Sequence, residues 1–122
     1  MILGIGTDII EIDRIKKAII NTPKFLDKLF TERELKQFNL DNPRIESIAG
    51  NFAVKEAVSK ALGTGMREIG FKDIEVFRDN LGKPFIEVSE KIDKVIKEEK
   101  YNFHVSISHN KTSAIAFVIL EV

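Results

Sequence analysis

The sequence contains no cysteine, and it has no excess of charge of either sign. The absence of cysteine excludes disulfides, thiolate metal sites and cysteine nucleophiles, and it is compatible with a reducing cytoplasm. The 19 lysines and arginines balance 19 acidic residues, which argues against a dedicated nucleic-acid-binding protein. No apolar run approaches the roughly 20 residues that cross a bilayer, and the first residues lack the basic segment of a signal peptide. We therefore expect a cytoplasmic protein whose partners include neither nucleic acid nor membrane.

The 122 residues fit a single domain spanning residues 1–122, without internal repeats or low-complexity tracts. Residues 2–12 are β-branched and apolar with two glycines, which predicts a strand that has Asp8 in its middle. A short amphipathic helix is expected from about Asp13, and Pro23 limits it.

Two further helices are predicted from capping residues and apolar spacing. Thr31 and Glu34 have the spacing of a capping box, which predicts a helix over residues 31–39. The longest periodic segment follows, with Asn42 as its expected cap and Gly63 as its stop. Its apolar positions recur at helical spacing and predict one broad stripe facing the core: Ile45, Ile48, Ala49, Phe52, Ala53, Ala57, Ala61 and Leu62.

The second half of the chain alternates between strand and helix patterns. Residues 71–77 and 83–89 flank "RDNLG" and predict a hairpin, and Ser89 is the expected cap of a further helix. Residues 103–110 and 113–122 predict two more strands around a turn. This order predicts an α+β fold, in which a mainly antiparallel sheet packs against a long helix and shorter helices.

Polar residues of the first strand and the long helix are candidates for chemistry. A buried carboxylate such as Asp8 is costly unless it is paired or bound to metal, although it can also face water. Glu56 and Lys60 have the spacing of an ordinary exposed ion pair. Together with Lys55 and Ser59, however, they form a polar face just before a Gly-Thr-Gly stop, where lysines and accessible backbone amides suit a phosphate. The residues alone leave both interpretations open.

The two histidines, His104 and His109, would point to opposite faces of a regular strand and do not predict a zinc site. Without cysteine, the metal chemistry that the sequence favours is hard and oxygen-liganded. Asp8 and Glu56 could hold Mg²⁺ together with water and phosphate oxygens.

Three segments together carry a resemblance to a known family: "GIGTDIIEIDRI", "NFAVKEAVSKALGTG" and "VSISHNKTSAIAFV". In this order and separation they resemble the holo-acyl-carrier-protein synthases, the short type of 4′-phosphopantetheinyl transferase. The resemblance covers nearly the whole chain. It implies transfer of phosphopantetheine from coenzyme A to a serine of apo-acyl carrier protein, with release of 3′,5′-ADP, in support of fatty acid biosynthesis.

The resemblance also implies roles for individual residues. Asp8 and Glu56 would hold Mg²⁺ against the pyrophosphate of coenzyme A, with Lys60 adding positive charge and Glu56 as the first candidate to accept the serine proton. The residues expected around the nucleotide, besides Lys60, are Arg44, Gly63, Thr64, Gly65, Ser108 and His109. Those expected to contact the acidic carrier protein are Arg14, Lys24, Phe25 and Lys28.

The family is usually a homotrimer with active sites shared between neighbouring chains, and the same assembly is expected here. One departure is Asn51, because relatives often have an arginine there that helps to bind the 3′-phosphate of coenzyme A. Arg44 or Lys111 could compensate. Two alternatives stay open: a non-catalytic module that binds carrier protein or nucleotide on the same fold, and a metal-dependent phosphohydrolase.

Overall fold

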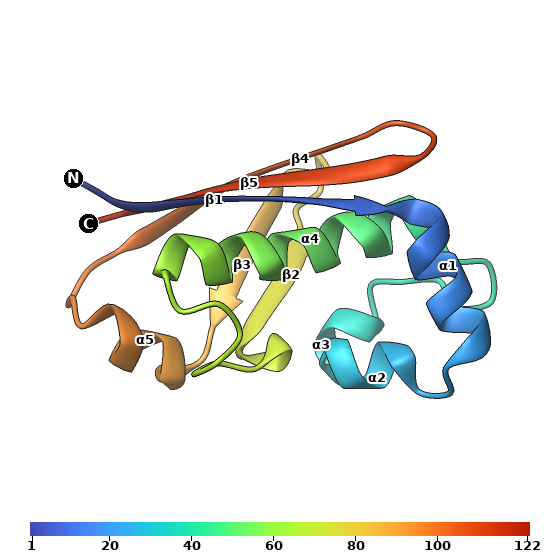
Figure 1. Ribbon diagram of the computed structural model, residues 1–122, viewed down its shortest axis with the longest axis horizontal. Coiled ribbons are helices and arrows are strands. Elements are labelled where there is room, and N and C mark those ends of the chain that lie inside the picture. The colour runs from blue at the N-terminus through green and yellow to red at the C-terminus, as the bar shows by residue number, and fades with distance from the viewer.

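The computed structural model describes all 122 residues and places a three-stranded antiparallel sheet along one long helix, α4 (Figure 1). The strand order in this sheet is β1-β5-β4. The bounds of these elements are β1 Ile2–Glu11, β4 Asn102–His109, β5 Ser113–Glu121 and α4 Ile45–Leu62. The two chain ends lie side by side, since the amino group of Met1 donates to the carbonyl of Val122.

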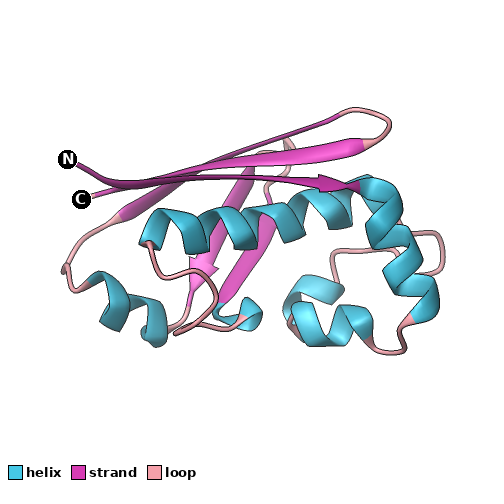
Figure 2. Cartoon of the chain, in the orientation of Figure 1, coloured by secondary structure: helices cyan, strands magenta, loops and turns pink.

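A separate hairpin of two strands, β2 (Ile74–Arg78) and β3 (Pro84–Val88), follows a single 3₁₀ turn, η1 (Phe71–Asp73). The α+β class, the antiparallel pairing and the hairpin around "RDNLG" are confirmed. The strands form two sheets, where one was expected. Figure 2 shows the reason: the hairpin runs steeply across α4, whereas the other three strands run along it.

The shorter helices are α1 (Ile12–Asn21), α2 (Phe25–Leu29), α3 (Glu32–Leu35) and α5 (Glu90–Ile96). The sequence did not predict α2, and α3 is shorter than the predicted helix over residues 31–39. The capping box is confirmed, because the Thr31 hydroxyl accepts from the Glu34 amide at 3.2 Å while the Glu34 carboxylate accepts from the Thr31 amide at 3.1 Å. The helix ends early because its next residues form tighter turns and the Gln37 side chain donates to the Val76 carbonyl.

Helix α4 is the centre of the fold, since 11 of its 18 residues are buried. It begins at Ile45 with Arg44 in the cap position, so the prediction of Asn42 as the cap was wrong; the first helical hydrogen bonds are accepted by the Arg44 carbonyl. Its predicted stop is confirmed, because Gly63 has the left-handed backbone (φ 77°) that ends a helix. None of the helices combines the length and apolarity that a membrane crossing requires.

Strand β1 lies in direct backbone contact with α4. A Cβ atom added to Gly4 would stand 1.9 Å from the carbonyl oxygen of Ala61, and one added to Gly6 would stand 1.9 Å from that of Ala57. Only glycine therefore fits at these two positions. Because side chains alternate along a strand, Asp8 lies on the same face as both glycines and is turned towards α4.

We predict that Gly6→Ala destabilises the protein by about 3 kcal/mol or more, because the added methyl group forces strand and helix apart. Chemical denaturation at one fixed protein concentration measures the change in the free energy of unfolding. Gly70→Ala is the matched control, since a Cβ there would meet its nearest atom at an ordinary 3.4 Å. A loss for Gly6→Ala no larger than that of the control would contradict the close contact.

Candidate active site

Asp8, Glu56 and Lys60 meet where β1 runs beside the second half of α4. The Lys60 ammonium lies 3.3 Å from the Asp8 carboxylate and donates to the Thr7 carbonyl at 2.9 Å. The Asp8 side chain is 18% exposed, whereas that of Lys60 is 55% exposed. The ion pair is therefore open to solvent on the lysine side, where a ligand could reach it.

The two carboxylates are close enough to affect each other. Burial raises the pKa of Glu56, the negative charge of Asp8 raises it further, and Lys60 opposes the shift. A cation bound to both carboxylates would relieve this repulsion. The donor set suits Mg²⁺, which prefers oxygen ligands and usually keeps waters or takes substrate phosphates as further ligands. No group of three or more His, Cys, Asp or Glu side chains competes with it as a metal site.

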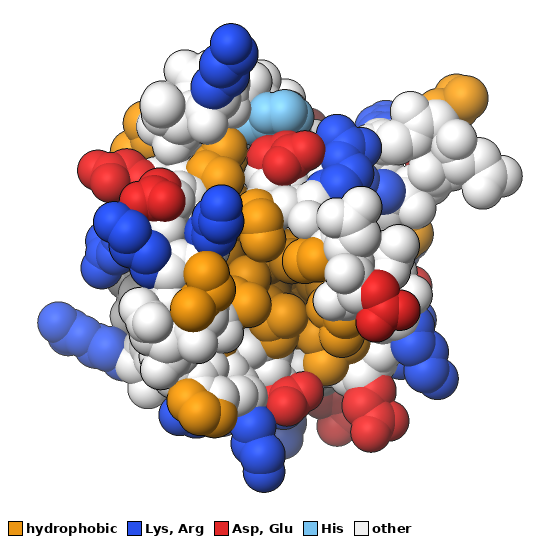
Figure 3. Space-filling model, turned by 90° about the vertical axis from the view of Figure 1, so that its right-hand side faces the viewer, with side chains coloured by type: hydrophobic (Ala, Val, Ile, Leu, Met, Phe, Trp, Pro, Cys, Tyr) orange, Lys and Arg blue, Asp and Glu red, His pale blue; other side chains and the backbone are white.

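A pocket of about 500 Å³ opens beside these carboxylates. Asp8, Glu56, Arg14 and Phe25 line it, and most of the remaining wall is apolar. Two of the predicted carrier-protein residues thus share a pocket with the predicted metal ligands. Lys24 lines a neighbouring pocket and Lys28 is exposed. Seen from the side of α1, hydrophobic side chains gather in a hollow ringed by acidic and basic ones (Figure 3).

The predicted nucleotide residues lie at two ends of α4. Gly63, Thr64 and Gly65 follow its last turn, next to Lys60. Arg44 precedes its first turn, and His109 lines a pocket there with Glu46. Because the helix has 18 residues, its ends are about 27 Å apart. Ser108 is exposed on β4. One chain alone therefore does not bring the predicted nucleotide residues together.

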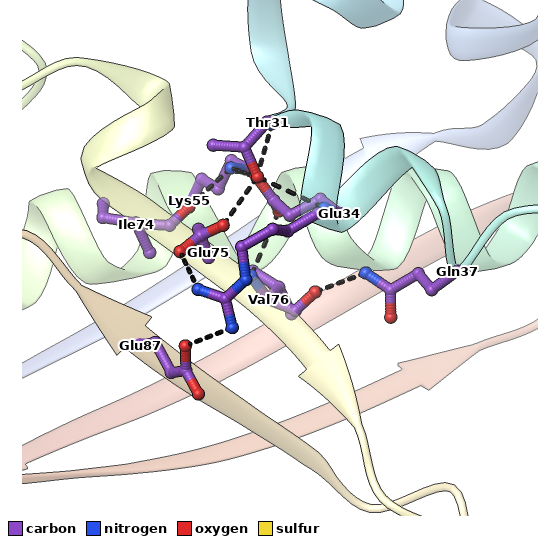
Figure 4. Close-up of polar contacts among 9 residues, drawn as sticks. Thr31, Glu34, Gln37, Lys55, Ile74, Glu75, Val76 and Glu87 are labelled. Atoms are coloured by element: carbon purple, nitrogen blue, oxygen red, sulfur yellow. Dashed lines mark hydrogen bonds and ion pairs between the residues drawn. The ribbon is translucent and has the colours of Figure 1, made fainter.

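The predicted ligand face of α4 was wrong for Lys55 and Ser59, which are both buried. The Lys55 ammonium donates to the Glu34 carboxylate at 2.8 Å and to the backbone carbonyl of Ile74 at 2.5 Å (Figure 4). It also donates to the backbone carbonyl of Phe71 at 2.8 Å. Burial lowers the pKa of Lys55, and Glu34 opposes the shift. Ser59 donates to the Glu56 carbonyl.

A sequence signal for the burial of Lys55 did exist. Ile48 lies seven residues before Lys55 and Leu62 seven residues after it. Seven residues return to nearly the same side of a helix, so Lys55 belongs to the apolar stripe. The polar face that remains accessible consists of Glu56 and Lys60.

We predict that Glu56→Gln stabilises the protein at alkaline pH in the absence of divalent cations. Because the fold raises the pKa of Glu56, its ionised form opposes folding above that raised value, and the penalty is absent below the ordinary value of 4.5. The variant should melt on the order of one to three degrees higher than the natural protein at pH 8, and the difference should disappear near pH 4.

The measurement is the melting temperature of the natural protein and of Glu56→Gln across this pH range. Glu68→Gln, which alters an exposed carboxylate without a side-chain hydrogen bond, is the control and should not change the melting temperature. A Glu56→Gln protein that melts below the natural one at pH 8 would show that the carboxylate stabilises the fold.

The paired carboxylates, the adjacent lysine and the largely apolar pocket suit an enzyme that transfers phosphate esters, a reaction that depends on positioning and charge neutralisation. Comparison with known proteins identifies the family: residues 4–118 match the model of the 4′-phosphopantetheinyl transferase superfamily. The chain belongs to this superfamily.

Individual relatives extend the match over the whole chain. The holo-(acyl-carrier-protein) synthase of Clostridium botulinum is 55% identical over 122 residues, covering 100% of this chain and 99% of its own. The crystal structure of the Bacillus anthracis synthase in complex with CoA (3′,5′-ADP) is 43% identical, with a TM-score of 0.83 over 99% of this chain and 97% of that one. The Helicobacter pylori synthase in complex with coenzyme A is 37% identical, with a TM-score of 0.81 over 96% and 99%.

Proposed function

We propose that this protein transfers the 4′-phosphopantetheine group from coenzyme A to a serine of apo-acyl carrier protein, giving the holo form and 3′,5′-ADP. The observation that carries the proposal is that Asp8 and Glu56 line one pocket and Lys60 pairs with Asp8, in a chain that matches holo-acyl-carrier-protein synthases over its full length. The proposed setting is the cytoplasm, in support of fatty acid biosynthesis.

In the proposed reaction, the serine oxygen forms a bond to the β-phosphorus of coenzyme A. The bond from this phosphorus to the bridging oxygen breaks, and 3′,5′-ADP leaves with that oxygen. Lys60 contributes positive charge to the phosphates. Glu56 is the proposed acceptor of the serine proton, because its carboxylate lines the same pocket as Asp8.

Asp8 and Glu56 are the residues that would hold Mg²⁺. The chemistry that the ion supplies when bound is neutralisation of the pyrophosphate charge and stabilisation of the departing phosphate. The two carboxylates repel each other, and a cation bound to both would offset this repulsion, which supports the assignment.

The carrier protein would dock beside the same pocket. Arg14 and Phe25 line the pocket together with Asp8, and Lys24 and Lys28 are exposed close to Phe25 in the chain. An acidic recognition helix would be guided by the three cations, whereas Phe25 offers an apolar contact.

We further propose a homotrimer. The outer face of the three-stranded sheet exposes Ile5, Ile9, Ile115 and Phe117, which are between 39% and 68% accessible in one chain. They are neighbours, because Ile9 pairs with Ile115 and the next outward pair includes Phe117. Covering this face with further copies would bury it and would allow one chain's carboxylates to meet the nucleotide residues of another.

The test is the intact mass of purified apo-acyl carrier protein after incubation with this protein, coenzyme A and Mg²⁺. We expect a gain of one phosphopantetheine arm and an equal amount of 3′,5′-ADP. Asp8→Ala should lower the rate by at least about a hundredfold, because it removes one of the two metal ligands.

Light scattering of Asp8→Ala is the control, and it should show the natural assembly, three times the 13.9 kDa of one chain. Release of phosphopantetheine without any carrier protein would indicate a phosphohydrolase instead. No gain of mass with a folded protein would favour a binding module.

A further inference from the structure

Helix α4 carries a lysine whose side chain has no access to solvent. Lys55 is fully buried, and its ammonium donates to the Glu34 carboxylate and to the backbone carbonyls of Phe71 and Ile74. A lysine ammonium has three N–H donors, so all of them are used within the protein. Lys55 therefore has no donor left for a ligand, and the proposed reaction gives it no task.

Glu34, the partner of Lys55, is equally buried and equally bonded. One of its carboxylate oxygens accepts from Lys55 and from the Thr31 amide, and the other accepts from the Val76 amide (Figure 4). The pair thus joins α4 to α3, η1 and β2 by directional hydrogen bonds. At Lys55, α4 can neither turn about its axis nor slide along it without breaking several of them.

Glu56, the next residue of the helix, depends on this restraint for its direction. Its carboxylate has no hydrogen-bond partner of its own, so the backbone of α4 decides where it points. Successive residues project about 100° apart around a helix axis, and Glu56 is accordingly half-buried at the pocket while Lys55 lies in the interior. A rotation of α4 at Lys55 would therefore turn Glu56 by the same angle.

The geometry that a shared cation requires is finer than an unrestrained helix would keep. Mg²⁺ takes its oxygen ligands at about 2.0–2.1 Å and demands a nearly ideal octahedral arrangement. Side-chain groups lie about 5–6 Å from a helix axis, so a rotation of about 20° moves a carboxylate by about 2 Å. A small turn of α4 would therefore separate Glu56 from a cation that Asp8 holds.

Lys55 also contacts the segment that leads away from α2. Phe25 of α2 lines the same pocket as Glu56. Five residues later, the ring centroid of Phe30 lies 5.0 Å from the Lys55 ammonium, which is the distance of a cation–π contact. The lysine thus restrains α4 relative to the segment that follows another part of the pocket wall.

We propose that Lys55 is a positioning residue, which together with Glu34 holds α4 in the rotation that lets Glu56 share a divalent cation with Asp8. This inference rests on the metal site of the proposed function. Stability alone does not account for the pair, because apolar side chains of similar volume commonly stabilise a protein as well as a buried ion pair does. Apolar packing lacks the directional bonds that fix a rotation.

The experiment measures Mn²⁺ binding by electron paramagnetic resonance in the presence of coenzyme A, with coenzyme A alone as the blank. Lys55→Met should weaken Mn²⁺ binding on the order of tenfold, the loss typical of removing a residue that orients a metal ligand. The variant leaves Glu34 buried without its partner, so it should also melt at a lower temperature. Lys55→Arg keeps a cation beside Glu34 and should bind Mn²⁺ more tightly than Lys55→Met.

A double variant separates positioning from stability. Glu34→Gln/Lys55→Met removes both charges, so it should recover part of the melting temperature that Lys55→Met loses. Its Mn²⁺ affinity should stay on the order of tenfold below that of the natural protein, because the bonds that fix the rotation of α4 are still missing. If Mn²⁺ affinity returns together with the melting temperature, the pair only stabilises the fold and the proposal is overturned.

Ile92→Ala is the matched control, since it removes a fully buried side chain from α5, which does not line the pocket of Asp8 and Glu56. It should lower the melting temperature through the cavity it leaves and should not change Mn²⁺ affinity. A loss of Mn²⁺ affinity as large as that of Lys55→Met would show that any destabilisation disturbs the site, and it would contradict a specific role for Lys55.

Mn²⁺ binding also separates this inference from the proposed function. Tight binding by the natural protein and weak binding by the two methionine variants would support the positioning role even if no phosphopantetheine reaches a carrier protein. Equal binding by the natural protein and Lys55→Met would overturn the positioning role, whether or not transfer occurs. A natural protein that binds no Mn²⁺ would overturn the metal site and the positioning role together.

Discussion

The backbone contact between β1 and α4 is the constraint on which the site depends. Two residues of a strand advance about 6.6 Å, and four residues of a helix advance about 6.0 Å. Because these distances are similar, every second residue of β1 can meet every fourth residue of α4. Gly4 meets Ala61 and Gly6 meets Ala57. Asp8 lies two residues further along the strand and lines one pocket with Glu56, which directly precedes Ala57. Small residues at these positions thus set the distance between carboxylates that come from opposite ends of the first 60 residues.

The opposite side of α4 is fixed by a buried ion pair. Lys55 bonds to Glu34 of α3 and to two carbonyls around η1, and Glu34 accepts from the Val76 amide in β2. A buried pair of this kind is sensitive, because loss of one partner costs about 3–5 kcal/mol. Glu56 follows Lys55 directly, so its place on the helix is held from both sides: by backbone contact with β1 and by the ion pair.

The sequence predicted elements with a local signal and missed those decided by distant contacts. Strands, hairpins and the stop at Gly63 were correct because alternation and turn residues act within a few positions. The division into two sheets depends on how the β2–β3 hairpin crosses α4, which no local pattern records. The burial of Lys55 was readable from its spacing to Ile48, but its partner Glu34 had been assigned only a capping role.

The candidate site divides in the same way. The residue patterns made Asp8, Glu56 and Lys60 candidates, the family resemblance assigned them to the site, and the structure brings them together. The hydrogen bond from Arg78 to Asn51 was not predicted, because an arginine at the end of the β2–β3 hairpin has no distinguishing pattern in the sequence. The predicted nucleotide residues lie at the two ends of α4, and only the proposed homotrimer would bring them into one binding site.

Asp8 and Glu56 are proposed to form one divalent-cation site. Paramagnetic Mn²⁺ accepts the same oxygen ligands as Mg²⁺, so its binding can be counted directly by electron paramagnetic resonance in the presence of coenzyme A. We expect one Mn²⁺ per chain, and loss of binding in both Asp8→Asn and Glu56→Gln. Binding that persists in either variant with natural affinity would show that the two carboxylates do not share a metal.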